Sequence, residues 1–308
     1  MTFYNRRGRY EGQGTGSLMK KLATAKRIAF EKILFATDFS SYSNAALPYA
    51  LAISHQYGSK VYATHILSPE AYFFVTPGSW PTSEEQMDVA RLEMHLRNSP
   101  HQVLSPAGDI SDVLFRLIRD NQIDLLVLGT HGRSGLSKVL MGSVAEKIFR
   151  LASIPVLTVG PWVSREQKGV AEFNQIVFAT NFNDESVSAA SYALSLAQEY
   201  HARLSLLHVL EQPQTATVDF ESNADFVIRR MREIIPSDAD LWFRPEYLVE
   251  FGQVEDQILK FADVHKADLI VLGVRAPEAA LTSVTHLAYS QAQHIVAHAT
   301  CPVLTVRG

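Results

Sequence analysis

The second half of this chain repeats the first, and this internal repeat sets the number and size of its folding units. Four apolar segments recur in the same order, with offsets that run from 143 residues (Ile33 to Ile176) to 147 residues (Pro155 to Pro302). A period this long indicates two copies of a domain, because the units of solenoid proteins are much shorter. The 308 residues are a natural length for two domains of ordinary size. The paired segments are Ile33–Phe39 with Ile176–Phe182, Tyr62–Ile66 with Leu206–Val209, Asp124–Gly129 with Asp268–Gly273, and Pro155–Val159 with Pro302–Val306.

Within each copy, β-rich apolar runs alternate with helical patterns. This alternation is typical of a parallel sheet with helices on both faces. In the first copy, the pattern predicts strands near 32–37, 60–66, 101–105, 124–128 and 155–159, and helices near 41–57, 84–99, 110–121 and 143–152. Ser40 or Asp38 can cap the first helix, and Gly58 can end it. We therefore expect an α/β protein of two tandem Rossmann-like domains, each an open five-stranded parallel sheet.

Changes in composition along the chain predict where the domains begin and end. Residues 1–30 hold seven Lys and Arg side chains against the single acid Glu11, with several glycines, which is typical of a flexible arm. We favour an unstructured extension, upstream of a start at Met19, over a basic tether for nucleic acid or a membrane surface. The predicted boundaries are 31–160 for the first domain, 161–173 for a charged linker and 174–308 for the second domain.

The overall composition narrows the range of partners. A net charge of −4 and 19% charged residues give no global attraction to nucleic acid or to an anionic membrane. No apolar run has the length of a membrane span, and the N-terminus lacks the apolar core of a signal peptide. Cys301 is the only cysteine, so an internal disulfide is excluded. These features lead us to expect a cytoplasmic protein.

A glycine-rich segment in the first copy follows an apolar strand and leads into a helix. Gly129, Gly132 and the pair Gly142–Ser143 form the pattern G-x2-G-x9-G-S. Backbone N–H groups at a helix start lack intrahelical partners and attract anions, and glycine lets a phosphate approach the backbone. Ser143 can supply an N-cap hydroxyl and a donor to a phosphate oxygen. The alternative is a loop that only turns the chain; neither a P-loop nor a Gly-rich dinucleotide turn is present.

This motif and its flanks, Ile123–Gly129, Ser143–Ile148 and Ile154–Val159, resemble the nucleotide-binding signature of ATP-binding universal stress proteins. The resemblance implies an adenine-nucleotide alpha hydrolase-like fold and ATP as the ligand, with or without Mg²⁺. It places Ala36 and Asp38 in the adenosine pocket, where Asp38 would accept a hydrogen bond from a ribose hydroxyl. Asp38 can instead only cap the first helix, or do both. The other implied contacts are Ile66 and Leu128 to the base, and Gly129, Gly132, Arg133, Gly142, Ser143 and Val144 to the phosphates.

The second copy departs from the motif at the positions that would contact a nucleotide. Asn181 replaces the aspartate, no second glycine follows Gly273 closely, and Tyr289 stands where Gly142 does. A tyrosine there would keep a phosphate away from the backbone. We expect the second copy to keep the fold and to lose ATP binding, the alternative being an unusual loop that still binds a nucleotide.

Other clusters of reactive side chains give weaker patterns. His294 and His298 share one helical face, near His286 and Cys301, but lack a partner carboxylate, so we expect no metal site. We also assign no catalytic residue, because no base or metal set accompanies the glycine motif. Aromatic residues in the segment 68–84 can form a lid over the adenosine or a partner surface.

These observations together predict a stress-response protein that binds ATP in its first domain as a regulatory signal. In relatives, such domains pair through their last strands, so segments 155–159 and 302–306 would join the two copies as a pseudo-dimer. We also expect a homodimer, and no membrane or nucleic acid as partner. The alternatives are a slow ATP hydrolase and an interaction scaffold that needs no nucleotide.

Overall fold

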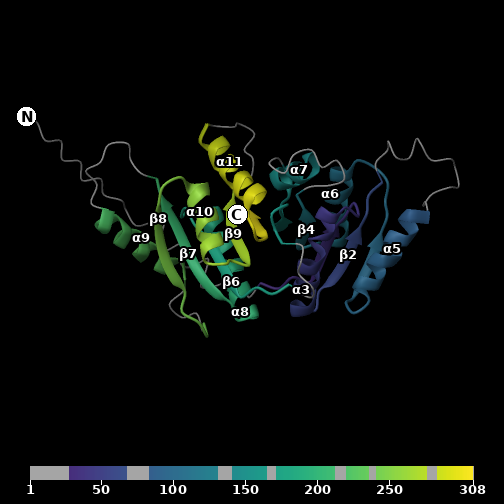
Figure 1. Cartoon of the computed structure of the whole chain (residues 1–308), viewed down its shortest axis with the longest axis horizontal. Coiled ribbons are helices and arrows are strands. Elements are labelled where there is room, and N and C mark those ends of the chain that lie inside the picture. The colour runs from purple at the N-terminus through teal and green to yellow at the C-terminus, as the bar shows by residue number, and fades with distance from the viewer. Residues whose placement is uncertain are drawn as a thin grey trace, which may run out of the picture.

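The described strands of both halves form one continuous sheet. The computed structural model describes residues 28–67, 83–130, 141–164, 171–211, 220–235, 241–275 and 283–307. In these residues the sheet has ten strands, in the order β3-β2-β1-β4-β5-β10-β9-β6-β7-β8 (Figure 1). Neighbouring strands within each half are parallel, so each half is the five-stranded parallel sheet that the sequence predicts.

The first half contains every strand that the sequence predicts for it. Its strands are β1 Lys32–Ala36, β2 Lys60–Thr64, β3 His101–Leu104, β4 Leu125–Gly129 and β5 Val156–Val159. Its helices are α2 Ser41–Asn44, α3 Leu47–Tyr57, α5 Ser83–Leu96, α6 Ile110–Asn121 and α7 Ser143–Leu151. The agreement follows from strongly apolar strand cores, which are buried along their whole length in β4 and β5 apart from Gly129.

The second half repeats the same order of elements. Its strands are β6 Gln175–Ala179, β7 Arg203–Leu210, β8 Glu246–Phe251, β9 Leu269–Val274 and β10 Val303–Arg307. Its described helices are α8 Asp184–Tyr200, α9 Phe220–Ile234, α10 Val254–Val264 and α11 Ser283–His298. The protein is therefore a tandem of two Rossmann-like α/β units.

The prediction of a single helix over 41–57 is wrong, because this segment forms two helices. A short helix, α2, is capped by Ser40, whose hydroxyl accepts from the Ser43 N–H at 3.1 Å. The chain then breaks, and α3 starts again with Pro48 in its first turn. Proline lacks the N–H that would continue the ladder from α2, but it fits the first turn of a new helix. Gly58 ends α3 in the left-handed conformation (φ 68°), as predicted.

The two halves meet through their last strands. Strands β5 and β10 are antiparallel, with Leu304 opposite Leu157 and Thr305 opposite Val156. Two threonine hydroxyls add symmetric bonds across this seam: Thr158 donates to the Val303 carbonyl at 3.1 Å and Thr305 to the Val156 carbonyl at 3.3 Å. The expected pairing of the two copies is confirmed, and it removes two exposed sheet edges.

Apolar side chains form a layer on each face of the sheet, and both layers run through both halves. Ile33 and Phe35 point to the face covered by α3, α5, α8 and α9, while Leu34 points to the face covered by α6, α7, α10 and α11. Each large side chain buried in this way contributes about 1.5–3 kcal/mol of stability.

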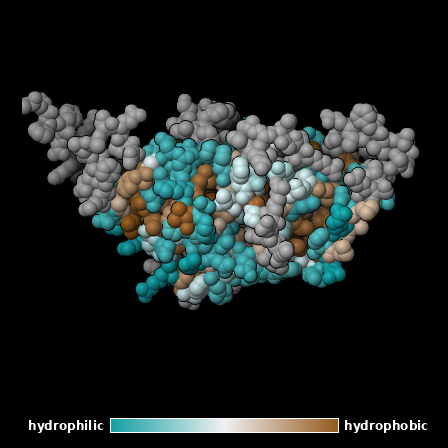
Figure 2. All heavy atoms as spheres, in the orientation of Figure 1, coloured by the Kyte–Doolittle hydropathy of each residue, from teal (hydrophilic) through white to brown (hydrophobic). Residues whose placement is uncertain are grey.

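One face of the molecule shows how polar and apolar residues are distributed on the described surface. In the view of Figure 2, most of the described surface is hydrophilic, and hydrophobic residues show as separate patches. Among the described residues, no helix has the length and apolar character needed to cross a membrane.

Candidate functional site

The strand order of the first half places a switch in chain direction at the carboxyl edge of its sheet. Strand β1 lies between β2 and β4, so the chain leaves it first to one side and later to the other, and ligands of α/β sheets bind at such a switch point. The register places Ala36 opposite both Thr64 and Leu128. Ile66 follows β2 and is buried, and Leu128, near the end of β4, is buried in the same apolar layer. The structure thus brings together the residues that the sequence assigns to the base.

Asp38 organises the turn that follows β1. Its Oδ1 accepts from the Ser40 N–H at 3.0 Å and from the Ser43 hydroxyl at 2.7 Å. The next residue, Phe39, has a positive φ of 62°, which is uncommon outside glycine. Ser40, and not Asp38, is therefore the N-cap of α2, while the half-buried carboxylate of Asp38 holds the turn that precedes the helix.

Thr37 and His65 pack against this turn, and neither is among the site residues predicted from the sequence. His65 is 7% exposed, and its Nδ1 lies 3.0 Å from the Thr37 carbonyl. Since a carbonyl only accepts, the proton is on Nδ1. The ring also contacts Phe39, with 4.6 Å between centroids. The internal repeat could have pointed to them, because the second copy has the same residue types at the matching positions, Thr180, Phe182 and His208.

Gly129 has a packing role that is independent of any ligand. A Cβ on this residue would lie 2.8 Å from the Tyr42 carbonyl oxygen and 3.0 Å from the Ser43 Cα. The start of α2 can approach the end of β4 only because residue 129 has no side chain. The same explanation holds for Gly273, whose Cβ would lie 2.5 Å from the Glu185 backbone. A glycine here is therefore required in both halves, whatever they bind.

The start of α7 differs in detail from the prediction. Gly142, rather than Ser143, occupies the N-cap position, and no side chain caps the helix. Ser143 is the first helical residue, so its predicted N-cap role is wrong. The Gly142 N–H donates to the Thr130 carbonyl at 2.9 Å, and the first intrahelical bond runs from Glu146 to Gly142. The N–H groups between them, those of Ser143, Val144 and Ala145, have no intrahelical partner and sit at the positive end of the helix.

Several predicted features lie outside the described residues. Gly132 and Arg133 are among them, as are the basic arm through residue 27 and segment 68–82. Of the residues assigned to the nucleotide, the structure places Ala36, Asp38, Ile66, Leu128, Gly129, Gly142, Ser143 and Val144 at one edge of the first half.

The second half keeps this turn, but the residues around it differ from those of the first half. The Asn181 Oδ1 accepts from the Ser186 hydroxyl at 2.7 Å and from the Asn183 N–H at 3.3 Å, as Asp38 does in the first half. Arg275, just after β9, pairs with Glu185 at 3.4 Å. Helix α11 already begins at Ser283, so Tyr289 and Ser290, the counterparts of Gly142 and Ser143, lie inside a helix. Their N–H groups belong to the helical ladder and not to a helix start.

The described residues contain no group of three or more His, Cys, Asp and Glu side chains that could hold a metal ion. His294 and His298 stack with 4.0 Å between ring centroids, and the His298 Nδ1 lies 2.8 Å from the His294 carbonyl. Cys301 is buried, which raises the pKa of its thiol to about 12. That thiol therefore stays protonated near neutral pH.

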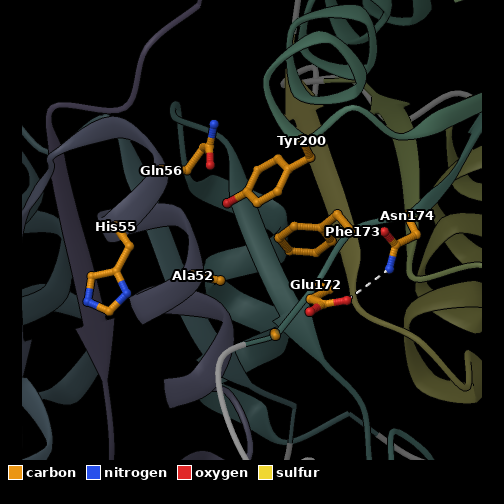
Figure 3. Close-up of a pocket in the computed structure, with 8 residues that line it drawn as sticks. Ala52, His55, Gln56, Glu172, Phe173, Asn174 and Tyr200 are labelled. Carbon is orange, nitrogen blue, oxygen red and sulfur yellow. Dashed lines mark hydrogen bonds between the residues drawn. The ribbon is translucent and has the colours of Figure 1, made fainter.

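A cavity of about 450 Å³ opens near the carboxyl ends of α3 and α8 (Figure 3). It lies between α3 and the segment that leads into β6, and Phe173 packs edge-on against Tyr200 beside it. Burial strongly raises the pKa of the Tyr200 hydroxyl. The lining is mostly polar and consists of Ala52, His55, Gln56, Ala171, Glu172, Phe173, Asn174 and Tyr200. None of these lining residues is among those assigned to the nucleotide.

Comparison with known proteins agrees with this geometry. The sequence model of the Universal stress protein family matches the chain twice, over residues 29–160 and 172–307. The chain belongs to the universal stress protein family. Two matches make it a tandem member, in which each half corresponds to one copy of the family's domain.

Universal stress proteins are among its relatives and its structural neighbours. One from Thermus aquaticus is 34% identical over 142 residues, which cover 44% of this chain and 99% of the relative. Universal stress protein G of Escherichia coli O157:H7 is 32% identical over 143 residues, 42% of this chain and 93% of the relative. A universal stress protein structure from Archaeoglobus fulgidus has a TM-score of 0.69 and 20% identity, over 90% of this chain and 98% of that chain, and shows the shared fold.

Proposed function

We propose that the first domain of this universal stress protein, residues 31–160, binds ATP at the carboxyl edge of its sheet. The nucleotide acts as a regulatory ligand in the stress response, and the second domain, residues 174–308, serves as the pseudo-dimer mate. Ala36, Ile66 and Leu128 supply an apolar wall for adenine.

The observation that carries this proposal is the pair Asp38 and Asn181. Both side chains make the same turn through one oxygen, so the turn alone does not require a carboxylate. Keeping a charged group half-buried has a desolvation cost that an amide avoids. A carboxylate has acceptor sites for several bonds, so Asp38 can keep its turn bonds and also accept from a ribose hydroxyl.

The phosphates are assigned to the start of α7. The N–H groups of Ser143 and Val144 precede the first intrahelical bond, and they can donate to phosphate oxygens at the positive end of the helix dipole. Gly132 and Arg133 would add the remaining contacts. A Mg²⁺ ion, where present, would be held mainly by the phosphates, as is usual for this ion.

The second domain keeps an apolar layer at this place, with Ala179, Val209 and Leu272, but lacks the polar features of the site. Its carboxylate is replaced by Asn181, its helix start lies elsewhere, and Glu185 already neutralises Arg275. A phosphate would have to displace that carboxylate or lie beside it, which like charges disfavour. We therefore assign one nucleotide to each chain.

The test is to identify and count the bound ligand. Mass analysis of ligand released from the purified protein, followed by calorimetric titration, should give intact ATP and one site per chain. Two equivalent sites would contradict the assignment of the second domain. Absence of binding would favour the nucleotide-independent scaffold.

Hydrogen exchange separates a regulatory ligand from a substrate. We expect ATP to increase protection across residues 129–145, and AMP to do so less, because a ligand shifts an equilibrium only by its differential affinity. Unchanged protection, with steady phosphate release that Ser143→Ala abolishes, would replace the regulatory function by slow ATP hydrolysis.

A further inference from the structure

One side chain of the second domain holds the far end of helix α7. Arg307, at the end of β10, donates through Nη2 to the Phe149 carbonyl in the last turn of α7. Through Nη1 it also donates to the Arg275 carbonyl at 3.0 Å, just after β9. One planar guanidinium therefore joins a helix of the first domain to a strand end of the second, which its fork of N–H donors suits.

This contact stabilises the carboxyl end of α7. The last carbonyls of a helix lack intrahelical partners, and a cation there also interacts favourably with the negative end of the helix dipole. Phe149 itself is 2% exposed and packed in the apolar layer below α7. The half-buried Arg307 thus satisfies a carbonyl that packing keeps away from water.

The equivalent contact on the other side of the seam is absent from the described residues. The offset of 147 residues that relates β5 to β10 makes Gly160 the counterpart of Arg307 and Val296 the counterpart of Phe149. A Cβ on Gly160 would lie 3.1 Å from the Val296 carbonyl and 3.5 Å from the Ala299 carbonyl. At the end of α11, the backbone of residue 160 lies close to the helix. At the end of α7, an arginine side chain contacts the helix instead. The Arg307 contact therefore has no equivalent in the other half, and it is made to the domain to which we assign the nucleotide.

We infer that Arg307 is a positioning residue for the phosphate-binding end of α7, so that the second domain completes the nucleotide site of the first. The inference rests on the proposed function. Helix α7 is a short rigid element from Ser143 to Leu151, and its axis fixes where the N–H groups of Ser143 and Val144 point. Displacement of its carboxyl end moves its amino end as well, and hydrogen bonds weaken steeply when misaligned.

The test compares Arg307→Gln with Arg229→Gln in the full chain. Arg229 is exposed on α9, far from the seam, so its substitution removes the same charge without touching α7. We expect Arg307→Gln to weaken ATP about fivefold or more, the usual scale of coupling between linked sites. Adenosine, which makes no phosphate contact, should lose less than about twofold. Hydrogen exchange of the ligand-free protein should show faster exchange at residues 143–147 in this variant alone.

A second variant guards against a general loss of structure. Arg307→Lys keeps the charge but cannot donate to both carbonyls from one plane, so it should recover part of the ATP affinity. Equal losses for ATP and adenosine, or normal ATP binding in Arg307→Gln with unchanged exchange, would overturn the positioning role while the proposed function stands. A wild-type protein that binds no adenine nucleotide would overturn the proposed function, and this inference with it.

Discussion

Replacing Asp38 by Asn copies into the first domain the residue that the second domain already uses. Asn181 makes both turn bonds through its Oδ1, at 2.7 Å to the Ser186 hydroxyl and 3.3 Å to the Asn183 N–H. Asp38→Asn should therefore keep the turn and change the free energy of unfolding by no more than about 0.5 kcal/mol. The fold is held constant, so the substitution isolates the charge.

The loss of ATP affinity follows from the kind of hydrogen bond that is exchanged. A bond to a charged group contributes about 1.5–3 kcal/mol, and a neutral one about 0.5–1.5 kcal/mol. The variant should therefore bind ATP more weakly by roughly 1–1.5 kcal/mol, or about fivefold to tenfold. Calorimetric titration of both proteins with ATP measures this difference directly.

Deoxy analogues show whether the ribose is the partner of Asp38. Removing the 2′ or 3′ hydroxyl should weaken binding to the wild type, and the same removal should matter less in Asp38→Asn, as a double-mutant cycle requires. Asn181→Asp is the matched control and should leave ATP binding unchanged. Equal ATP affinity of wild type and Asp38→Asn would show that Asp38 serves only the turn.

Three further substitutions test neighbouring features. Gly142→Tyr should weaken ATP far more than adenosine in the same titration, because its ring would occupy the phosphate position beside the Thr130 carbonyl, 3.2 Å from a new Cβ. Gly273→Ala should lower the free energy of unfolding by about 2 kcal/mol or more in denaturant titration, since its Cβ would lie 2.5 Å from backbone. Burial lowers the pKa of His208, so its stabilising contribution is present above pH 6.5 and lost as the pH falls through the lowered value. In His208→Gln, the melting temperature should fall less between about pH 7 and pH 5.

The fold follows from the sequence because its strands are buried on both faces. Runs such as Leu125–Gly129 are short and apolar at almost every position, which is typical of interior parallel strands. Because the second half repeats these runs in the same order, the same fold is predicted for the second domain. The break between α2 and α3 is less visible, because the apolar periodicity continues across it and only Pro48 marks the new start.

The sequence predicts a site residue only where the residues next to it in the chain form a recognisable motif. The glycine motif marks the edge of the sheet, but Gly129 is also required by the passing backbone of Tyr42, which no spacing reveals. His65 acts through a carbonyl at the end of another strand. The start of α11 at Ser283 was not among the predictions, because a sequence pattern fixes helix boundaries less well than the helices themselves.

The contrast between Arg307 and Gly160 indicates what a tandem chain can do that a pair of identical chains cannot. In a symmetric homodimer, a residue and its symmetry mate are the same, so an arginine clamp on one helix implies the same clamp on the other. Here the seam keeps symmetric threonine bonds, while its two helix ends are held differently, one by a guanidinium and one by close backbone contact. When the two domains belong to one chain, a residue in one domain can differ from the residue at the matching position of the other. The second domain can then lose its own carboxylate and helix start, and still be retained because β10 pairs with β5 and Arg307 holds α7.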